Sequence, residues 1–246
     1  MKEMTNEIWE KYLSHNENLP IEKTLNNLKP IIDMHLLYVG YLVGKFLDLG
    51  MGDGYVLDKM KNKGSISENL YGASINQKEV DFVKAKGHQV FHEDMHNLSF
   101  EDNFFNVVYT RQTLEHSIAP YMAFSEIYRI LKNNGKLILI VPPTIDITKG
   151  NSKFAYMHNS ASKHYSVLTE DQLFTLWNKF SFVLKDMWTL MTPNGIDKGY
   201  LLQKTEESEI PKFELASYSE LNLKNGAIKN YKIEDNKICK ENENES

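Results

Sequence analysis

The sequence predicts an α/β protein with a doubly wound, mostly parallel β-sheet. An apolar strand at 46–49 runs directly into three glycines at alternate positions and then into an amphipathic helix. A second strand-like run at 106–110 is followed by a helix that Pro120 opens, and a third lies at 136–141. Strands that alternate with helices in this way are typical of a parallel sheet with helices on both faces.

Hydrophobic periodicity and turn residues predict the other elements. The run Thr-Glu-Asp-Gln at 169–172 is a capping box, so a helix is expected to start there. Strands at 182–188 and 200–203 are expected to pair as a hairpin across 193–195. The remaining predictions are helices at 53–62, at 79–86 and from Pro120 to the Asn134-Gly135 pair, and strands at 70–75 and 88–92.

The chain divides into three predicted regions. Residues 1–43 are helical, with an apolar face that includes Trp9 and Tyr12, and form a cap before the core. The pair could close over a ligand, but aromatic residues at helical spacing more often pack. Residues 44–204 form the α/β domain, with an insertion at 144–168 over its active edge. The tail at 205–246 is rich in Glu, Lys and Asn and is expected to be peripheral and flexible.

Composition excludes several classes of protein. The formal net charge is −5, and among 28 basic residues only Arg111 and Arg129 are arginines, so nucleic acid is an improbable partner. Cys239 is the only cysteine, which rules out an internal disulfide and a cysteine metal cluster. The sequence offers no secretion signal, and its longest apolar stretch, 31–44, is interrupted and too short for a membrane span. We therefore expect a cytoplasmic protein without a metal.

The glycine segment predicts a ligand site at the end of the first strand. Glycines permit a tight turn and a close approach of the backbone to a ligand, and the next helix offers its free N–H groups. The dinucleotide fingerprint G-x-G-x-x-G needs a sixth glycine, but that position is Tyr55. The segment Asp48-x-Gly50-x-Gly52-x-Gly54 resembles instead the first motif of the class I S-adenosylmethionine-dependent methyltransferases.

Further segments carry the same resemblance, strongly over 44–143 and weakly to about 203. In the family, an Asp after the third strand accepts a hydrogen bond from the adenine amino group and the next N–H reaches a ring nitrogen; Asp94 and Met95 occupy these positions. Asn106 replaces the family's usual Asp in the fourth strand. The resemblance implies a Rossmann-like, seven-stranded sheet with an antiparallel last strand, and S-adenosylmethionine as cofactor. The cofactor-binding residues it implies are Asp48, Gly50, Met51, Gly52, Gly54, Ser74, Ile75, Asp94, Met95 and Arg111.

One position departs from the family. The end of the second strand normally carries an acidic residue for the two ribose hydroxyls, and here it is Ser74. Loss of a charge-assisted hydrogen bond costs about 1.5–3 kcal/mol, so ribose binding is expected to weaken unless Asn76 or Gln77 compensates. Calorimetry with the cofactor tests whether binding survives.

The resemblance implies displacement of the sulfonium methyl by an acceptor atom, for which the enzyme mainly supplies proximity. His116 follows the fourth strand near the sheet's ligand-binding edge and is the candidate base, although a histidine after Glu115 could simply cap a helix end. His158, His164 and Tyr165 are candidate substrate-binding residues or ordinary loop residues.

Two functions from different classes therefore stand. The first is a methyltransferase that acts on a small-molecule or sugar-like acceptor. The second is a non-catalytic relative that binds the cofactor, its product or a partner, with Ser74 marking lost catalytic pressure. A nicotinamide-dependent oxidoreductase is disfavoured by Tyr55.

Overall fold

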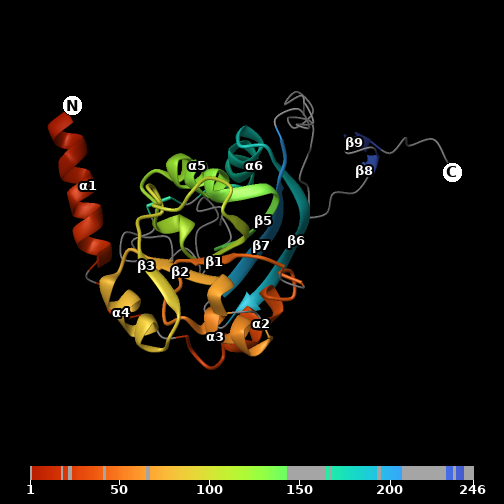
Figure 1. The fold of residues 1–246 in the computed structure, drawn as a ribbon. Helices are drawn as coiled ribbons and strands as arrows, with labels where there is room; N and C mark the ends of the chain where they lie inside the picture. Colours follow the sequence, from red (N-terminus) through yellow and green to blue (C-terminus); the bar gives the residue numbers. More distant parts are fainter. Residues whose placement is uncertain are drawn as a thin grey trace. The chain divides into compact units, whose positions relative to one another are not determined.

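The protein folds around one seven-stranded sheet (Figure 1). The structure is a computed structural model, and it describes residues 2–17, 19–21, 24–40, 43–64, 67–142, 165–166, 168–192, 195–206, 231–234 and 237–240. The chain divides into two compact units, Met1–Glu206 and Glu207–Ser246. The sheet and its helices belong to the first unit, which also contains the predicted cap and α/β domain.

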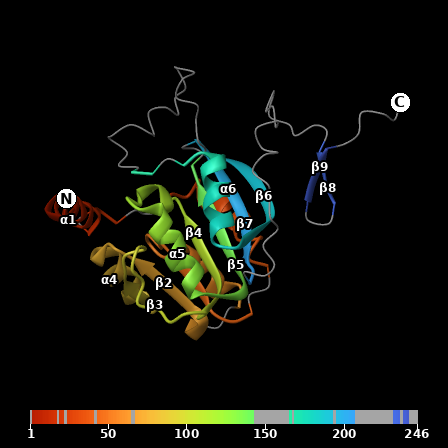
Figure 2. The same cartoon turned by 90° about the horizontal axis from the view of Figure 1, so that it is seen from above.

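The strands of the sheet follow the order β3-β2-β1-β4-β5-β7-β6. Figure 2 shows the strands from above, with β4, β5, β7 and β6 labelled towards one side of the sheet and β2 and β3 towards the other. Neighbouring strands from β3 to β5 run parallel, and β7 pairs antiparallel with both β5 and β6. The predicted class, a doubly wound sheet with an antiparallel end, is therefore confirmed. The strands are β1 (Phe46–Leu49), β2 (Leu70–Ser74), β3 (Gln89–His92), β4 (Phe105–Arg111), β5 (Leu131–Val141), β6 (Phe182–Thr192) and β7 (Gly195–Lys204).

Helices cover both faces of the sheet (Figure 1). Helices α5 and α6 pack on one face through Phe124, Ile127 and Trp177, and α2, α3 and α4 pack on the other through Ile32 and Leu57 among others. Each face thus has its own apolar core, which explains why the central strands are apolar throughout. The helices are α1 (Lys2–Glu17), α2 (Lys29–His35), α3 (Tyr55–Asn62), α4 (Gln77–Ala85), α5 (Pro120–Ile130) and α6 (Glu170–Lys179), with short 3₁₀ turns η1 (Ser67–Asn69) and η2 (Leu114–His116).

Several predicted boundaries differ from the structure: α4 begins two residues earlier than predicted, and β5, β6 and β7 are longer than the strands predicted for them. Two of the differences have a clear local origin. Helix α3 begins at Tyr55 rather than at 53, because Gly54 adopts a left-handed φ of 77° at the N-cap. Helix α5 ends at Ile130 and β5 begins at the next residue. The Asn134-Gly135 pair therefore does not end the helix but lies in an irregular part of β5, where Asn134 has a φ of 62° and the pairing with β4 changes register.

The capping box at the start of α6 is confirmed. The Thr169 hydroxyl accepts a hydrogen bond from the Gln172 N–H at 3.2 Å, and the Gln172 side chain accepts one from the Thr169 N–H at 2.8 Å. Two donors at the helix start that would otherwise lack partners are thereby satisfied.

The second unit contains a two-stranded antiparallel hairpin, β8 (Tyr231–Glu234) and β9 (Lys237–Lys240). The sequence analysis expected only a flexible tail here and did not predict these strands. Among the described residues, no helix is long and apolar enough to cross a membrane.

Candidate active site

A cavity of about 610 Å³ opens at the carboxyl ends of β1, β2 and β4. In the sheet, β1 lies between β2 and β4: the next strands along the chain, β2 and β3, extend the sheet on one side of β1, and β4 and β5 extend it on the other. The cavity therefore lies at the point where the strand order reverses. Ligands of open α/β sheets bind at such a point, and the volume is in the range of small-molecule sites. Nine of the predicted site residues line the cavity: Asp48, Gly50, Met51, Gly52, Ser74, Ile75, Met95, Arg111 and His116.

The glycine corner after β1 is shaped for close approach. Gly50 and Gly52 have φ angles of 81° and 53°, which favour glycine. A Cβ on Gly50 would lie 2.1 Å from the Thr113 hydroxyl oxygen, so only a hydrogen fits. Gly54 does not line the cavity but packs against Val83, which a Cβ would approach to 2.7 Å.

The N-terminal segment is fastened to this corner. The Asp53 carboxylate accepts hydrogen bonds from the Thr24 N–H at 2.8 Å and the Thr24 hydroxyl at 2.7 Å. Tyr12, Asn16 and Leu28 from the same segment line the cavity. The segment before the sheet therefore forms part of the wall.

Asp48 places a carboxylate at the bottom of the cavity. It is 2% exposed, and its Oδ2 has no hydrogen-bond partner among the described residues. Burial, reinforced by the negative charges of Asp53 and Glu79, raises the pKa of Asp48 to about 8. The neighbouring Tyr109 hydroxyl, on the strand position paired with Asp48, is buried and likewise has no partner among those residues.

Such orphaned buried groups are costly and call for a polar ligand. A ligand with a positive charge would stabilise the ionised Asp48. S-adenosylmethionine carries a sulfonium and an ammonium group, so the donor set of this site fits that cofactor.

Ser74, at the end of β2, is tied to a carboxylate that the sequence analysis missed. Its hydroxyl donates to Glu79 Oε2 at 2.7 Å and accepts from the Asn76 N–H at 3.0 Å. The Asn76 amide caps α4 and donates to the Leu19 carbonyl, and Gln77 bonds to Asp81 at the surface. Neither of the two amides proposed to compensate for Ser74 lines the cavity, whereas Glu79 does.

Asp94 lies beside the cavity and belongs to a buried hydrogen-bond chain. Its Oδ1 accepts from the His96 N–H at 3.1 Å and contacts His96 Nδ1 at 2.6 Å, while His96 Nε2 contacts the Ser117 hydroxyl at 2.7 Å. This order resembles a hydrolase relay, but Ser117 is fully buried and lines neither described cavity. The chain therefore joins the loop after β3 to the loop after β4. Glu93 and Met95, on either side of Asp94, line the cavity.

A second polar network closes the opposite wall. Asp197, on β7, accepts from Arg111 Nε at 2.9 Å and from Gln112 Nε2 at 3.1 Å, and its Oδ2 lies 3.0 Å from His35 Nε2. Burial raises the pKa of Asp197, but the hydrogen bond from His35 and the charge of Arg111 outweigh it and hold the pKa below its usual value. The Trp188 indole donates to His35 Nδ1 at 2.8 Å, so Nε2 carries the proton that His35 shares with Asp197.

His116 lies in η2 and lines the cavity, whereas Tyr165 is 47% exposed and does not. Tyr165 contacts Tyr12 edge-on, with ring centres 5.9 Å apart. His158 and His164 lie outside the described residues. Within the described residues no group of three His, Cys, Asp or Glu side chains could hold a metal ion.

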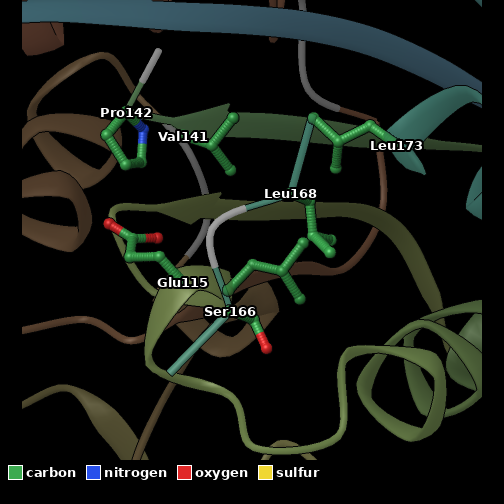
Figure 3. Close-up of a pocket in the computed structure, with 7 residues that line it drawn as sticks. Glu115, Val141, Pro142, Ser166, Leu168 and Leu173 are labelled. Carbon is green, nitrogen blue, oxygen red and sulfur yellow. The ribbon is translucent and has the colours of Figure 1, made fainter. Parts of the chain in front are cut away.

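Glu115 is a second buried carboxylate that the sequence analysis did not assign to the site. It is 2% exposed and lines both the large cavity and a separate cavity of about 10 Å³ between η2, the end of β5 and the start of α6 (Figure 3). The small cavity is about the size of one water molecule and has mostly apolar walls. Leu114, Val141, Pro142, Ser166, Leu168 and Leu173 complete its lining.

The fold and this cavity define a class of protein: a doubly wound α/β protein with a small-molecule cavity at the point where the strand order reverses, lined by a glycine corner and a buried acid. Comparison with known proteins narrows this class. A family model described as "Methyltransferase domain" matches residues 47–139. Residues 47–139 therefore match a methyltransferase domain, and the fold is that of the class I S-adenosylmethionine-dependent methyltransferases.

Individual relatives are distant. YrhH of Bacillus subtilis (strain 168), which is named as a methyltransferase, is 24% identical over 131 residues, 51% of this chain and 70% of YrhH. Magnesium protoporphyrin IX methyltransferase (ChlM) from Synechocystis PCC 6803, solved with bound S-adenosylhomocysteine (SAH), has a TM-score of 0.59 and 14% identity, covering 82% of this chain and 95% of ChlM. Geranyl diphosphate C-methyltransferase from Streptomyces coelicolor A3(2) has a TM-score of 0.58 and 13% identity, covering 72% and 77%. At such identities the two structures show the shared fold.

Proposed function

We propose that this protein transfers a methyl group from S-adenosylmethionine to a small-molecule or sugar-like acceptor. The observation that carries the proposal is the continuity of one cavity of about 610 Å³. It reaches from Gly50 at the cofactor corner to His116 and Gln112 after β4. Cofactor and acceptor could therefore meet in one enclosed space, which is what an in-line transfer needs.

The cofactor would lie along the carboxyl ends of β1 and β2. Asp48 would stabilise its positive charge, and the Gly50 corner would allow the backbone to approach it. Asp94 Oδ2 is the oxygen proposed for the adenine amino group, because both hydrogen bonds that the described residues make to this carboxylate fall on Oδ1. The remaining residues proposed to contact the cofactor are Met51, Gly52, Ser74, Ile75, Met95 and Arg111. Gly54, which the sequence analysis also assigned to the cofactor, would act indirectly, because it packs against Val83 and does not line the cavity.

Bound S-adenosylmethionine supplies an electrophilic methyl group on a sulfonium leaving group. The protein's own contribution would be to hold the acceptor close to this methyl and to exclude water. His116 would take the acceptor's proton on an imidazole nitrogen when the acceptor arrives protonated. His158, His164 and Tyr165 are proposed to contact the acceptor at the mouth of the site.

Two features of the wall favour a small acceptor without negative charge. Tyr12, Asn16 and Leu25 of the N-terminal segment line the cavity, so a macromolecule would have to displace this segment. Acidic side chains outnumber basic ones in the lining even without Asp48, because it contains Glu79, Glu93, Glu115 and Asp197 beside Arg111 and His116. Acidic walls repel the phosphates of nucleic acids, which are normally bound by lysine and arginine.

The acceptor class can be tested by incubating the protein with methyl-labelled S-adenosylmethionine and a cell extract separated by molecular mass. We expect label in the low-mass fraction only. Label in protein or nucleic acid fractions would contradict the proposed acceptor class. Tight SAH binding with no labelled fraction would favour the alternative, a non-catalytic cofactor-binding protein.

The role of His116 has its own test. Substitution His116→Asn is expected to lower kcat by about 10²–10⁴-fold and to leave SAH affinity unchanged, because a base acts on the acceptor and not on the cofactor. Arg129→Lys, which lies far from the cavity, serves as a control for non-specific losses. A variant with unchanged kcat at every pH would exclude His116 as the base.

A further inference from the structure

The strand end that lacks the expected acid is connected to another acid on the next helix. Glu79 lies in the first turn of α4, five positions after Ser74, and is 9% exposed. Its carboxylate Oε2 accepts the Ser74 hydroxyl at 2.7 Å, and both residues line the large cavity. The negative charge that the second strand lacks is therefore present beside the same corner of the site.

The hydrogen bonds of Ser74 limit what it can offer a ligand. Its only hydroxyl hydrogen goes to Glu79, and one lone pair accepts from the Asn76 N–H. One acceptor lone pair is left, which can satisfy one ligand hydroxyl at most. A carboxylate is charged and has two oxygens, so it can accept from two adjacent hydroxyls in a way that the single oxygen of Ser74 cannot. Glu79 is thus the better acceptor for two adjacent hydroxyl groups.

The position of Glu79 on its helix is unusual for a charged residue. It shares the inward face of α4 with Val80 and Val83, where glutamate is rarely found. The N-terminus of α4 favours a negative charge there, and the Asn76 cap fixes the start of the helix. The fold therefore supports a buried carboxylate at the edge of a polar cavity, where an apolar residue would otherwise pack.

We propose that Glu79 accepts the two ribose hydroxyls of the cofactor, and that Ser74 is a positioning residue that holds the Glu79 carboxylate in place. The inference rests on cofactor binding as proposed above. Under it, the ribose-binding acid of this chain has moved from the strand end into the first turn of the following helix. Ser74 is then compatible with tight cofactor binding rather than a sign of lost function.

The test is a cycle between protein and ligand variants, measured by calorimetry with SAH and its 2′,3′-dideoxyribose analogue. We expect the wild-type protein to prefer SAH by about 10- to 100-fold, as expected for charge-assisted hydrogen bonds. Glu79→Gln should bind SAH correspondingly more weakly and lose most of this preference, because the hydroxyls then have no charged acceptor. Asp81→Asn, an exposed carboxylate change on the same helix, should keep the wild-type preference.

Further variants keep the inference open to refutation. Glu79→Asp retains the charge but draws it back by one methylene, so it should show a reduced preference even if Glu79→Gln fails to fold. Ser74→Ala should lose part of the preference, and Ser74→Thr, which keeps the hydroxyl, should restore it. If either Glu79 variant keeps the full wild-type preference for SAH over the dideoxyribose analogue, this inference is overturned but the proposed function is not. Absence of SAH binding by the wild-type protein overturns both the inference and the proposed function.

Discussion

Under the proposed function, Asp48 is predicted to make cofactor binding depend on pH. Its pKa of about 8 means that the ligand-free protein holds Asp48 protonated at neutral pH. A cationic ligand interacts with the ionised carboxylate, so binding must release the proton. We therefore predict that the affinity for S-adenosylmethionine rises as pH rises towards 8.

The size of the effect follows from the ionised fraction of Asp48. For a pKa of about 8, roughly 0.3% of the carboxylate is ionised at pH 5.5 and roughly 9% at pH 7.0. Apparent affinity scales with the fraction that is competent to bind, so it should increase about 30-fold, or about 2 kcal/mol, over this interval. The ligand's own α-amino group stays largely protonated there, since such groups have a pKa of about 7.7–8.0.

The same proton affects stability. The folded protein binds this proton up to about pH 8, whereas an unfolded Asp releases it near pH 3.9. Between these values the folded state holds more protons, so the free energy of unfolding of the ligand-free protein falls as pH rises. Asp48→Asn is neutral at every pH and should not show this contribution.

The assay is calorimetric titration of S-adenosylmethionine into wild-type and Asp48→Asn protein at pH 5.5 and 7.0, in buffers with different heats of ionisation. Wild-type binding should release close to one proton per site more than the variant. The variant also corrects for protons exchanged by other groups, and Asp58 and Asp197 do not titrate in this range because their pKa values are lowered. Equal pH dependence in the two proteins would refute the reasoning.

Three further substitutions test the structure. Gly50→Ala should abolish measurable SAH binding, because the added Cβ meets a neighbouring side chain at 2.1 Å. The control is Gly64→Ala, which has a φ of 90° and nothing within 4 Å of the added Cβ, so it should cost only about 1–2 kcal/mol of stability and keep SAH binding. Equal effects of the two substitutions on SAH binding would contradict the close-approach argument. Trp188→Phe leaves His35 Nδ1 without its indole donor, so it should lower the free energy of unfolding, measured with urea, by about 1–3 kcal/mol. An unchanged free energy of unfolding would show that this hydrogen bond does not stabilise the fold. Arg129→Lys should cost about 1–2 kcal/mol in the same assay, since the guanidinium bonds the carbonyls of residues 98 and 100 together; an unchanged midpoint would exclude that role.

The sequence predicted the sheet because its signals are local. Central strands such as 136–141 are apolar throughout, and the capping box at Thr169 depends on residues three positions apart. The glycine corner was also readable, since positive φ angles at Gly50 and Gly52 restrict the residue type at the position itself. Nine predicted site residues accordingly line one cavity.

Contacts between distant segments were not readable. The end of α5 was misplaced because its last carbonyls bond to the Lys204 amine, which lies more than 70 positions along the chain. The partner of Arg111 is Asp197, 86 residues away, and no local pattern connects them. The sequence did contain a signal for Glu79, because a carboxylate lies on the apolar face of a helix. Only the hydrogen bond to Ser74, however, shows that this carboxylate lies beside the end of β2.

The sequence by itself determined the class of fold, the order of the strands and helices of the α/β domain, and the glycine corner at which we propose that the cofactor binds, because backbone conformation and side-chain periodicity act over a few residues. The tertiary structure alone decided which charges meet in the cavity. Asp48 acquires its raised pKa from burial that the whole fold provides, and Glu79 reaches the end of β2 only because α4 packs against the sheet. Solvent exclusion and the pairing of remote charges depend on how all the elements pack, and no short stretch of sequence contains that information.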